Sequence, residues 1–590
     1  MKTMSRRTLV GALALSWVLA ACGPDPEPWR GEGLVGAEGS VDWNRYYTND
    51  ETNGIMEAFT RLYPELTELR SIGRSYLGAD LMLMTVTNKD TGPAMEKPAL
   101  YLDGNIHAQE LTSSSVALYV MAHLLNSYGK DPRITELLDT RTFYVRPKFN
   151  PDGSDLVLKE DQFLRSGVRP VDDNGDGIPD SDPPEDLDGD GRILMMRVPD
   201  PDGNMRKSQE DTRIMVRRQP GDQGPFYRMI REGVDRNGDG IINSDGIGGL
   251  DMNRNFPRNW ERWHVQSGSG DFPLSEPETH ATVRFLNEHR NVGIIVHGHT
   301  SGGFVYRLPS AMDPAEFDAN DEALVIHLGS YYTETTGRRV IPSATHATAR
   351  RYGTLLQWAY WDQGIVGWVP EYSPGPEEWV PDCDGDGVIT EADWHCYNDE
   401  AFGGKYFKDW TPFDHPQLGP VEIGGWQSKF WGQNPPDELL EKELEVQLPW
   451  ILYLAEQLPR VRVSEPRITP LGDQRFQVEV TVTNEGYLPT NLTEQGLWGG
   501  GRGMAGAALQ VSPPPLVILE GTGSSIEEGN GRVRIPHLAG SSPYSPGATD
   551  RSATVSFVVQ RESPAAAVRF TVISDKGGVA RTELVALGSE

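Results

Sequence analysis

The sequence has 590 residues, which is too long for one ordinary hydrophobic core, so at least two domains are expected. It carries 54 Lys and Arg residues against 85 Asp and Glu residues, and the resulting net charge of −31 argues against nucleic acid or an anionic lipid surface as a partner. Hydrophobic residues make up 37% of the chain and include 15 Trp, which is enough for a packed interior and argues against global disorder.

The first residues are typical of a targeting signal. Lys2, Arg6 and Arg7 precede the apolar run LVGALALSWVLAA, which is too short for the roughly 20 residues that cross a bilayer. The run ends in LAAC, which resembles the lipobox of bacterial lipoproteins and implies cleavage before Cys22 and lipid attachment to its sulfur. We therefore expect residues 1–22 to be a lipoprotein signal peptide. The alternative is an ordinary signal with a chance Cys.

Strands and helices alternate through the next part of the chain. Residues 23–40 are rich in Pro and Gly and predict a tether. The expected helices are 51–66, 113–129, 275–290 and 438–458, and the expected strands are 79–88, 97–105, 141–153 and 291–299. This alternation predicts an α/β domain over residues 41–460, with a mixed central sheet flanked by helices.

The pattern changes after Pro459. Segments that alternate apolar and polar residues with period two are separated by turns rich in Pro and Gly, as in VEVTVTNEGYLPT. We expect an all-β sandwich over residues 461–590, which resembles the immunoglobulin-like accessory domains of exported bacterial enzymes. It contains no recognisable catalytic cluster.

Two potential metal ligands lie where a strand gives way to a helix, in DGNIHAQELTSS. A catalytic zinc commonly takes three protein ligands and leaves a fourth position for water. His107 and Glu110 are close in sequence, and a distant third ligand would complete the site. The candidate is His297, which ends the buried strand NVGIIV at a position where open α/β sheets place their sites. Taken alone, HAQE has another interpretation: the His lies in a loop, and the Glu lies in the first turn of a helix, where its negative charge interacts favourably with the helix dipole.

Several motifs in order resemble those of the zinc carboxypeptidase family, of which carboxypeptidase A is the type member. They are GRSYLGADLMLMTVTN, DGNIHAQE, FNPDG, LDMNRNFPRNW, FPLSEPET and IIVHGHTSGG, and the resemblance covers about Val41 to Leu458. The resemblance implies the carboxypeptidase fold and one catalytic zinc bound by His107, Glu110 and His297.

The same resemblance implies roles for residues around the metal. Asp251 matches the carboxylate that orients the first zinc-binding His. Asn253 and Arg254 match the pair that holds the substrate's terminal carboxylate, which suits the planar fork of Arg. Arg165 matches the arginine that stabilises the oxyanion, and Arg169 is a nearby alternative.

The general base is expected at the end of a late strand. Glu371 lies there, downstream of QWAY at the spacing the family suggests, while Glu377 and Glu378 are competitors in what resembles a loop. Leu356 matches the floor of the specificity pocket, and an apolar floor favours an apolar C-terminal side chain.

Two positions depart from the family pattern. Ala79 stands where the family often has a substrate-binding Arg, and Ala349 stands about where the mobile tyrosine that caps the terminal carboxylate is expected. Tyr352 and His346 are candidate replacements for that tyrosine. Both departures concern substrate binding more than bond cleavage.

Four acidic loops interrupt the expected α/β domain, in insertions at 170–250 and 373–400. Each has an acid or amide at positions one, three and five and Gly at position six, as in an EF-hand loop, but none has clear flanking helices. We predict calcium loops of the dockerin or thrombospondin kind, and the alternative is Asp-Gly turns without metal. The candidate calcium ligands are Asp172, Asn174, Asp176, Asp180, Asp186, Asp188, Asp190, Asp235, Asn237, Asp239, Asp382, Asp384, Asp386 and Asp393.

The chain has only three cysteines. If Cys22 carries lipid, Cys383 and Cys396 remain as a pair around the fourth loop. An exported chain meets an oxidising compartment, so a disulfide between these two is expected.

These features together predict an exported zinc carboxypeptidase that acts on peptides or proteins with a free C-terminus. We expect it to be anchored to a membrane facing the periplasm or the cell exterior, or secreted, with membrane contact only through a lipid anchor. The alternatives are a peptidase for cell-wall stem peptides, and a surface binding protein whose peptidase domain is silent.

Overall fold

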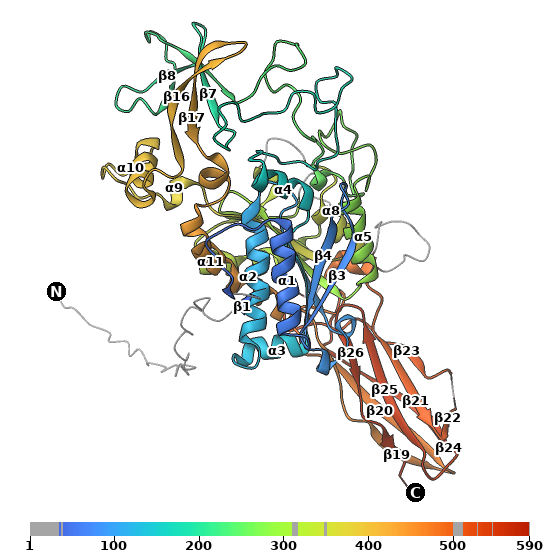
Figure 1. Cartoon of the computed structure of the whole chain (residues 1–590). Helices are drawn as coiled ribbons and strands as arrows, with labels where there is room; N and C mark the ends of the chain where they lie inside the picture. The colour runs from blue at the N-terminus through green and yellow to red at the C-terminus, as the bar shows by residue number, and fades with distance from the viewer. Residues whose placement is uncertain are drawn as a thin grey trace, which may run out of the picture.

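The computed structural model describes residues 35–36, 39–309, 317–346, 351–498, 511–527, 529–544 and 547–588 (Figure 1). The predicted signal peptide, Cys22, Ala349 and most of the predicted tether lie outside these residues. The short strands β1 (Val35–Gly36) and β2 (Gly39–Ser40) pair with each other. No helix among the described segments is long and apolar enough to cross a membrane.

A nine-stranded mixed sheet forms the centre of the α/β domain. Its strands are β3 Thr67–Arg74, β4 Asp80–Val86, β5 Ala99–Asp103, β6 Thr142–Arg146, β11 Val292–His297, β12 His299–Thr300, β13 Phe304–Arg307, β14 Val340–Pro342 and β15 Val366–Tyr372. The hydrogen-bonded order is β14-β13-β15-β11-β5-β6-β4-β3, with β12 paired to β15. The central strands β15, β11, β5 and β6 run parallel, and antiparallel pairs lie on either side of them. The predicted mixed sheet is confirmed.

Helices cover both faces of this sheet (Figure 1). They are α1 Asn49–Leu62, α2 Leu111–Ser127, α3 Pro132–Thr140, α4 Pro151–Lys159, α5 Pro277–Glu288, α6 Ala319–Thr336, α7 Ser343–His346, α8 Leu355–Gln363 and α11 Asp437–Glu456, with short 3-10 turns η1 Lys89–Thr91, η2 Ala94–Glu96 and η3 Met252–Arg254.

Strand alternation divides the core between the two faces. Leu100 and Leu102 belong to the cluster that α1, α2, α6 and α11 cover, whereas Ala99 and Tyr101 belong to the cluster that α5 covers. Successive residues of a strand point to opposite faces, so β5 is apolar on both sides, as expected of a parallel strand buried between helices. Such a sheet holds the carboxyl ends of its strands rigidly, and the candidate site lies there.

Two insertions far apart in sequence together form a second, six-stranded sheet, which projects beyond the α/β domain at the top of Figure 1. Its strands are β7 Met195–Pro199, β8 Met205–Lys207, β9 Met215–Arg217, β10 Tyr227–Arg231, β16 Phe407–His415 and β17 Gly419–Trp426. β7 pairs with β17, and Met196, Val198, Val421 and Ile423 form a small core between the two insertions. The second insertion therefore continues to β17, beyond the predicted end at residue 400.

A short helical segment joins this sheet to the α/β domain. It contains α9 Pro376–Trp379, α10 Glu391–Phe402 and the π-helix η5 Lys429–Gln433. Trp426 and Trp431 stack with ring centroids 4.6 Å apart, and Trp379 meets Trp431 edge-on at 4.7 Å. These aromatic contacts form a small hydrophobic cluster of their own at the junction.

The C-terminal part is all-β, as predicted. Its strands are β18 Val461–Val463, β19 Arg467–Gly472, β20 Arg475–Asn484, β21 Leu516–Thr522, β22 Ser524–Ile526, β23 Arg532–Arg534, β24 Ser552–Arg561, β25 Ala567–Ser574, β26 Gly578–Arg581 and β27 Val585–Ala586, with one short helix, α12 Glu494–Trp498. They form two antiparallel sheets whose inward residues share one core.

The β domain packs against the amino end of β11. Nζ of the buried Lys576 donates to the carbonyl of Val292 at 2.6 Å, and Arg290 pairs with Asp575 at 2.7 Å. His297 ends the same strand, and β11 spans roughly 20 Å at about 3.3 Å per residue. The β domain therefore lies at the end of the sheet opposite the candidate site.

Candidate active site

The turn between β5 and α2 carries the first two predicted metal ligands. Asn105 has a positive φ of 63°, and its side-chain amide donates to the carbonyls of His107 and Ala108 at 3.0 and 2.9 Å. Glu110 is the N-cap residue of α2, and its backbone N–H donates to the carbonyl of His107. This compact turn places the His107 and Glu110 side chains side by side in the interior, where both are buried.

The third member of this cluster is His299. Nδ1 of His107 lies 2.7 Å from Oε1 of Glu110, Nδ1 of His299 lies 2.9 Å from Oε2 of Glu110, and the two Nδ1 atoms are 3.1 Å apart. His299 belongs to β12, which pairs with β15 and so extends the sheet beyond the end of β11. Residues far apart in sequence are thereby brought within ligand distance of one point.

The prediction that His297 is a zinc ligand is wrong. His297 is in register with Asp103 across the parallel pair β11 and β5, and its Nδ1 lies 2.6 Å from Oδ1 of Asp103. His297 therefore stands behind His299, with ring centroids 4.6 Å apart, and His299 takes the ligand position.

The cluster has the electrostatic character of a metal site. Burial lowers the pKa of His299 to about 3, so the imidazole is neutral and its lone pair is free to bind a metal. Burial alone raises the pKa of Glu110, but His107 and His299 outweigh it and hold the pKa of this carboxyl below its usual range. One carboxylate and two ring nitrogens thus converge in the interior.

The donor set fits zinc. Two nitrogens and a carboxylate oxygen are the catalytic ligand type in which a fourth position stays open. Ligand atoms at the usual zinc distances lie about 3.3 Å apart in a tetrahedron, close to the separations between the Nδ1 atoms of His107 and His299 and the carboxylate of Glu110.

Asp251 holds the first histidine from behind. Its Oδ1 lies 3.0 Å from Nε2 of His107, the nitrogen that faces away from the cluster. Although burial acts to raise it, Arg254, Arg165 and His107 hold the pKa of Asp251 well below its usual range. Asp251 therefore stays ionised and fixes the ring orientation of His107, and such a contact is typical of a carboxylate that orients a metal ligand.

Arg165 reaches the edge of the cluster. Its Nε and Nη2 donate to Oδ2 of Asp251 at 3.1 and 3.0 Å, and its Nη1 donates to Oε1 of Glu110 at 3.4 Å. The alternative, Arg169, is paired with Glu276 at 2.9 Å and does not line the cavity. Of these two arginines, only Arg165 lines the cavity.

Asn253 and Arg254 lie in the turn η3, and Asn253 contacts His299. Nδ2 of Asn253 is 3.2 Å from Nε2 of His299, and Oδ1 of Asn253 accepts from the backbone N–H of Leu355. Nη2 of Arg254 lies 3.7 Å from Oδ2 of Asp251. These contacts hold both side chains at the wall of the cavity.

Glu371 faces the metal cluster from β15. It is in register with His299 of β12, which brings its carboxylate to the same cavity. Burial and the nearby Glu110 raise the pKa of Glu371 well above its usual value. Glu377 and Glu378, at the start of α9, do not line this cavity.

The side chains surround a cavity of about 400 Å³. Its lining comprises His107, Gln109, Glu110, Arg165, Asn253, Arg254, His299, Thr300, Ser301, Phe304, Tyr306, Arg307, Leu308, Ser343, Arg351, Thr354, Leu356, Val369, Glu371 and Gln433. Leu356, the predicted pocket floor, is among them, whereas Tyr352 and Ala79 are not. The side chain of His346, the other candidate for the capping role, lies outside the described residues.

Comparison with known proteins gives the family. The family model described as "Zinc carboxypeptidase" matches residues 52–182 and 185–381, more than half of the chain. The chain belongs to the zinc carboxypeptidase family. A second family model, "Domain of unknown function (DUF8731)", matches residues 460–585.

Individual relatives match over shorter stretches. Carboxypeptidase B of Astacus astacus is 32% identical over 126 residues, which are 21% of this chain and 39% of that protein. Carboxypeptidase A1 of Sus scrofa is 23% identical over 342 residues, 57% of this chain and 64% of that protein. The crystal structure of carboxypeptidase A from Helicoverpa armigera superposes with a TM-score of 0.43 at 12% sequence identity, covering 70% of this chain and 75% of that one. The chain thus spans less than two thirds of the length of the curated relatives named here.

The acidic loops bring carboxylates together in two places. Asp186, Asp188 and Glu232 form one group, and Asp382, Asp384 and Asp393 form another. Nζ of Lys408 lies 2.6 Å from Oδ2 of Asp190 in the first region.

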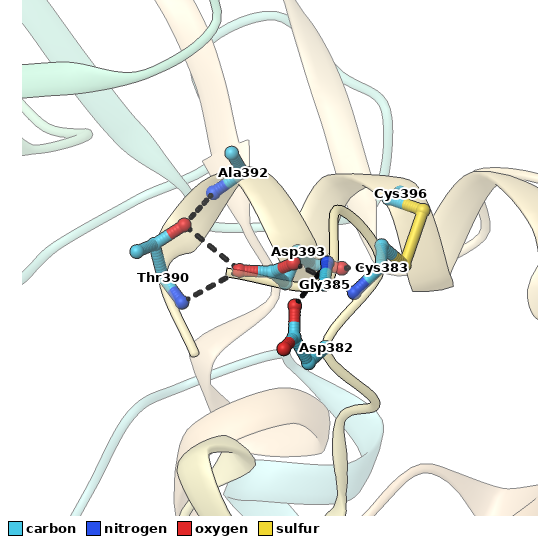
Figure 2. The surroundings of a disulfide bond; sticks show 7 residues. All are labelled: Asp382, Cys383, Gly385, Thr390, Ala392, Asp393 and Cys396. Atoms are coloured by element: carbon cyan, nitrogen blue, oxygen red, sulfur yellow. Dashed lines mark hydrogen bonds between the residues drawn. A yellow bond between two sulfur atoms is a disulfide. The ribbon is translucent and has the colours of Figure 1, made fainter. Parts of the chain in front are cut away.

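In the fourth loop the predicted disulfide is present. Cys383 is bonded to Cys396, and Oδ1 of Asp393 accepts from the backbone N–H of Cys383 at 2.9 Å (Figure 2). Contrary to the sequence prediction, this loop does lead into a helix, since Asp393 and Thr390 form the capping box of α10.

The first and third loops form a reciprocal pair. Oδ1 of Asp182 accepts from the backbone N–H of Arg236, and Oδ1 of Asp245 accepts from that of Asp173, at 2.9 and 3.1 Å. Asp182 and Asp245 also form a β-bridge. The two loops are therefore one structural unit and not independent turns.

Sequence reasoning missed two residues of the site. One is His299, which follows His297 by two residues, and the sequence alone does not show which of the two histidines pairs with Asp103 of the neighbouring strand. Arg351 lines the cavity beside Tyr306, and no motif in the sequence indicates this.

Proposed function

We propose that this protein is a zinc-dependent metallocarboxypeptidase that removes C-terminal residues from peptides. The observation that carries the proposal is the arrangement around one cavity. The cluster of His107, Glu110 and His299 has Glu371 and Arg254 in the same lining. A metal site, a base and a carboxylate-binding arginine are the three parts that such a reaction needs.

The chemistry follows from these positions. His107, Glu110 and His299 would hold the zinc, which would supply a Lewis acid for activating water and polarising the scissile carbonyl. Glu371 takes a proton from the attacking water and delivers it to the leaving amine nitrogen. Arg165 stabilises the negative charge that develops on the carbonyl oxygen.

Exopeptidase action depends on the second half of the cavity. Arg254 binds the terminal carboxylate through its planar guanidinium, and Asn253 beside it adds a polar contact. With the carboxylate held there, only the last peptide bond reaches Glu371 and the cluster, because a near-attack geometry tolerates little displacement.

The test is a matched pair of peptides, one with a free C-terminus and one amidated. Amidation removes the charge that Arg254 binds, so hydrolysis by the zinc-loaded protein should collapse. Equal cleavage of both peptides would indicate an endopeptidase. Turnover of neither, with zinc bound, would favour the alternative of a silent binding protein.

We also propose that the acidic loops bind calcium. What supports this is that Asp382, Asp384 and Asp393 converge, as do Asp186, Asp188 and Glu232. Carboxylate oxygens are the ligands that calcium prefers. Equilibrium dialysis with radioactive calcium would test it, and no saturable binding would contradict it.

We further propose that the protein is exported and anchored by lipid on Cys22. The support is the sequence LAAC after a basic and apolar leader. In a detergent phase-separation assay, the wild-type protein should partition into the detergent phase, whereas the Cys22→Ser variant should remain in the aqueous phase. Equal partition of the two would contradict the anchor.

A further inference from the structure

The cavity is lined by more positive than negative side chains. Arg165, Arg254, Arg307 and Arg351 contribute four guanidinium groups, against the carboxylates of Glu110 and Glu371. Glu110 is a proposed metal ligand, so bound zinc would make the cavity more positive still. Such a cavity favours substrates with more than one negative group.

Three of the four arginines have carboxylate partners or assigned roles. Arg165 is bound to Asp251 and Glu110. Arg254 has Asp251 3.7 Å away and is proposed to take the terminal carboxylate. Nη1 of Arg307 is paired with Glu322 at 2.9 Å.

Arg351 differs from these three. Its Nη1 donates to Oγ of Ser343 at 2.9 Å, its Nη2 lies 3.4 Å from the hydroxyl of Tyr306, and its guanidinium stacks on the Tyr306 ring at 4.8 Å. Both of these partners are neutral. Within the part of the chain that the structure describes, the guanidinium is therefore held in place by neutral groups, and no ion pair neutralises its charge.

The position of Arg351 relates it to the reacting centre. Tyr306, on which it stacks, is in register with Val369 of β15. Val369 lines the cavity and precedes Glu371 by two residues on the same face of the strand. Val369 and Glu371 are roughly 7 Å apart along the strand, so the Tyr306 ring that holds Arg351 is paired one same-face position away from the proposed base.

We propose that Arg351 makes the enzyme selective for peptides whose C-terminal residue is Glu or Asp. This inference rests on the proposed carboxypeptidase function. The terminal carboxylate binds Arg254, the side-chain carboxylate binds Arg351, and the apolar floor at Leu356 contacts the methylene groups between them. The proposal replaces the sequence expectation of an apolar C-terminal residue.

The primary experiment compares blocked dipeptides that end in Glu, Gln, Leu and Lys. Glu and Gln have nearly the same shape, so their ratio of kcat/KM isolates the charge. A charge-assisted hydrogen bond is worth about 1.5 to 3 kcal/mol, so wild type should prefer Glu over Gln by roughly 10- to 100-fold. A ratio of one or less would overturn the proposal.

Variants assign the preference to one arginine. Arg351→Met should bring the Glu-to-Gln ratio close to one, and Arg351→Glu should make Lys better than Glu. Arg307→Met is the matched control. It removes a guanidinium from the same cavity, but one that is already paired with Glu322, so this variant should retain the preference for Glu over Gln. If Arg351→Met lowers kcat/KM equally for all four peptides, Arg351 binds the terminal carboxylate and the proposal is wrong.

A binding measurement separates this proposal from the proposed function. Zinc-loaded Glu371→Gln protein should bind the Glu dipeptide more tightly than the Gln dipeptide by calorimetry, whether or not any peptide is cleaved. Selective binding without turnover in wild type would refute the peptidase function alone. Turnover without a Glu preference in either assay would refute only the role of Arg351.

Discussion

Nδ1 of the buried His297 lies 2.6 Å from Oδ1 of the buried Asp103, at paired positions on the neighbouring parallel strands β11 and β5. The pair satisfies an acid that would otherwise be buried without a partner. It also supports His299, whose ring lies 4.6 Å from that of His297. His297 therefore lies behind the candidate metal cluster of His107, Glu110 and His299 and is not one of its members.

Substitution separates the two histidines. His299→Ala should abolish both bound zinc and activity, since it removes one of three ligands. His297→Ala should retain close to one zinc per chain but lower the melting temperature, because it leaves Asp103 buried without a partner. Metal content by mass spectrometry and thermal unfolding provide the readouts. Loss of zinc from His297→Ala while His299→Ala keeps it would restore the original assignment.

Glu371→Gln should keep zinc and leave KM close to the wild-type value. The amide has nearly the same shape but accepts no proton, so kcat should fall by roughly 10²- to 10⁴-fold. Steady-state kinetics on a free-carboxylate peptide measures this. Glu378→Gln, outside the cavity lining, is the matched control, and a comparable loss of kcat there would shift the role of base to α9.

Calcium should raise the melting temperature if the acidic loops bind it. A ligand that binds only the folded state raises the free energy of unfolding by about 2.7 kcal/mol when its concentration is 100 times its Kd. Melting curves at increasing calcium, with zinc content followed in parallel, measure the effect. Asp382→Asn with Asp384→Asn should reduce the shift, and a melting temperature independent of calcium in the wild type would identify the loops as turns.

Asp321 predicts a pH dependence of stability. Its carboxylate accepts from the Tyr360 hydroxyl at 2.7 Å and the Glu494 backbone at 2.8 Å, and burial raises its pKa from 3.8 to about 7. Because the pKa of Asp321 is higher in the folded than in the unfolded state, its protonated form stabilises the fold. This stabilisation is complete at pH values below the unfolded-state pKa, and it is lost as the pH rises through about 7.

Comparison with Asp321→Asn isolates this group, because the amide has no titration. The free energy of unfolding of wild type relative to the variant should be roughly 2 to 3 kcal/mol lower at pH 7 than at pH 5. Denaturant unfolding of both proteins at each pH measures it. A difference independent of pH would show that Asp321 has the same pKa in the folded and unfolded states.

The sequence by itself determined the fold class and most of the site. Period-two and helical patterns are local, so they indicated the α/β domain and the all-β C-terminal part. His107 and Glu110 were identifiable because they lie three positions apart in one turn. The matching motifs singled out Asp251, which lies behind His107, and Glu371, which lines the cavity.

Only the tertiary structure decided between His297 and His299, since the two lie close together in sequence, at the end of β11 and in β12, and the choice depends on Asp103 in the neighbouring strand β5. The union of two distant insertions in one sheet was likewise invisible, because strand pairing is non-local. Arg351 acquires its role from Tyr306 and Ser343, which reach it from β13 and α7. Local sequence patterns record which face a side chain takes, but cavities are formed by side chains from separate elements, and their contacts arise only when the chain folds.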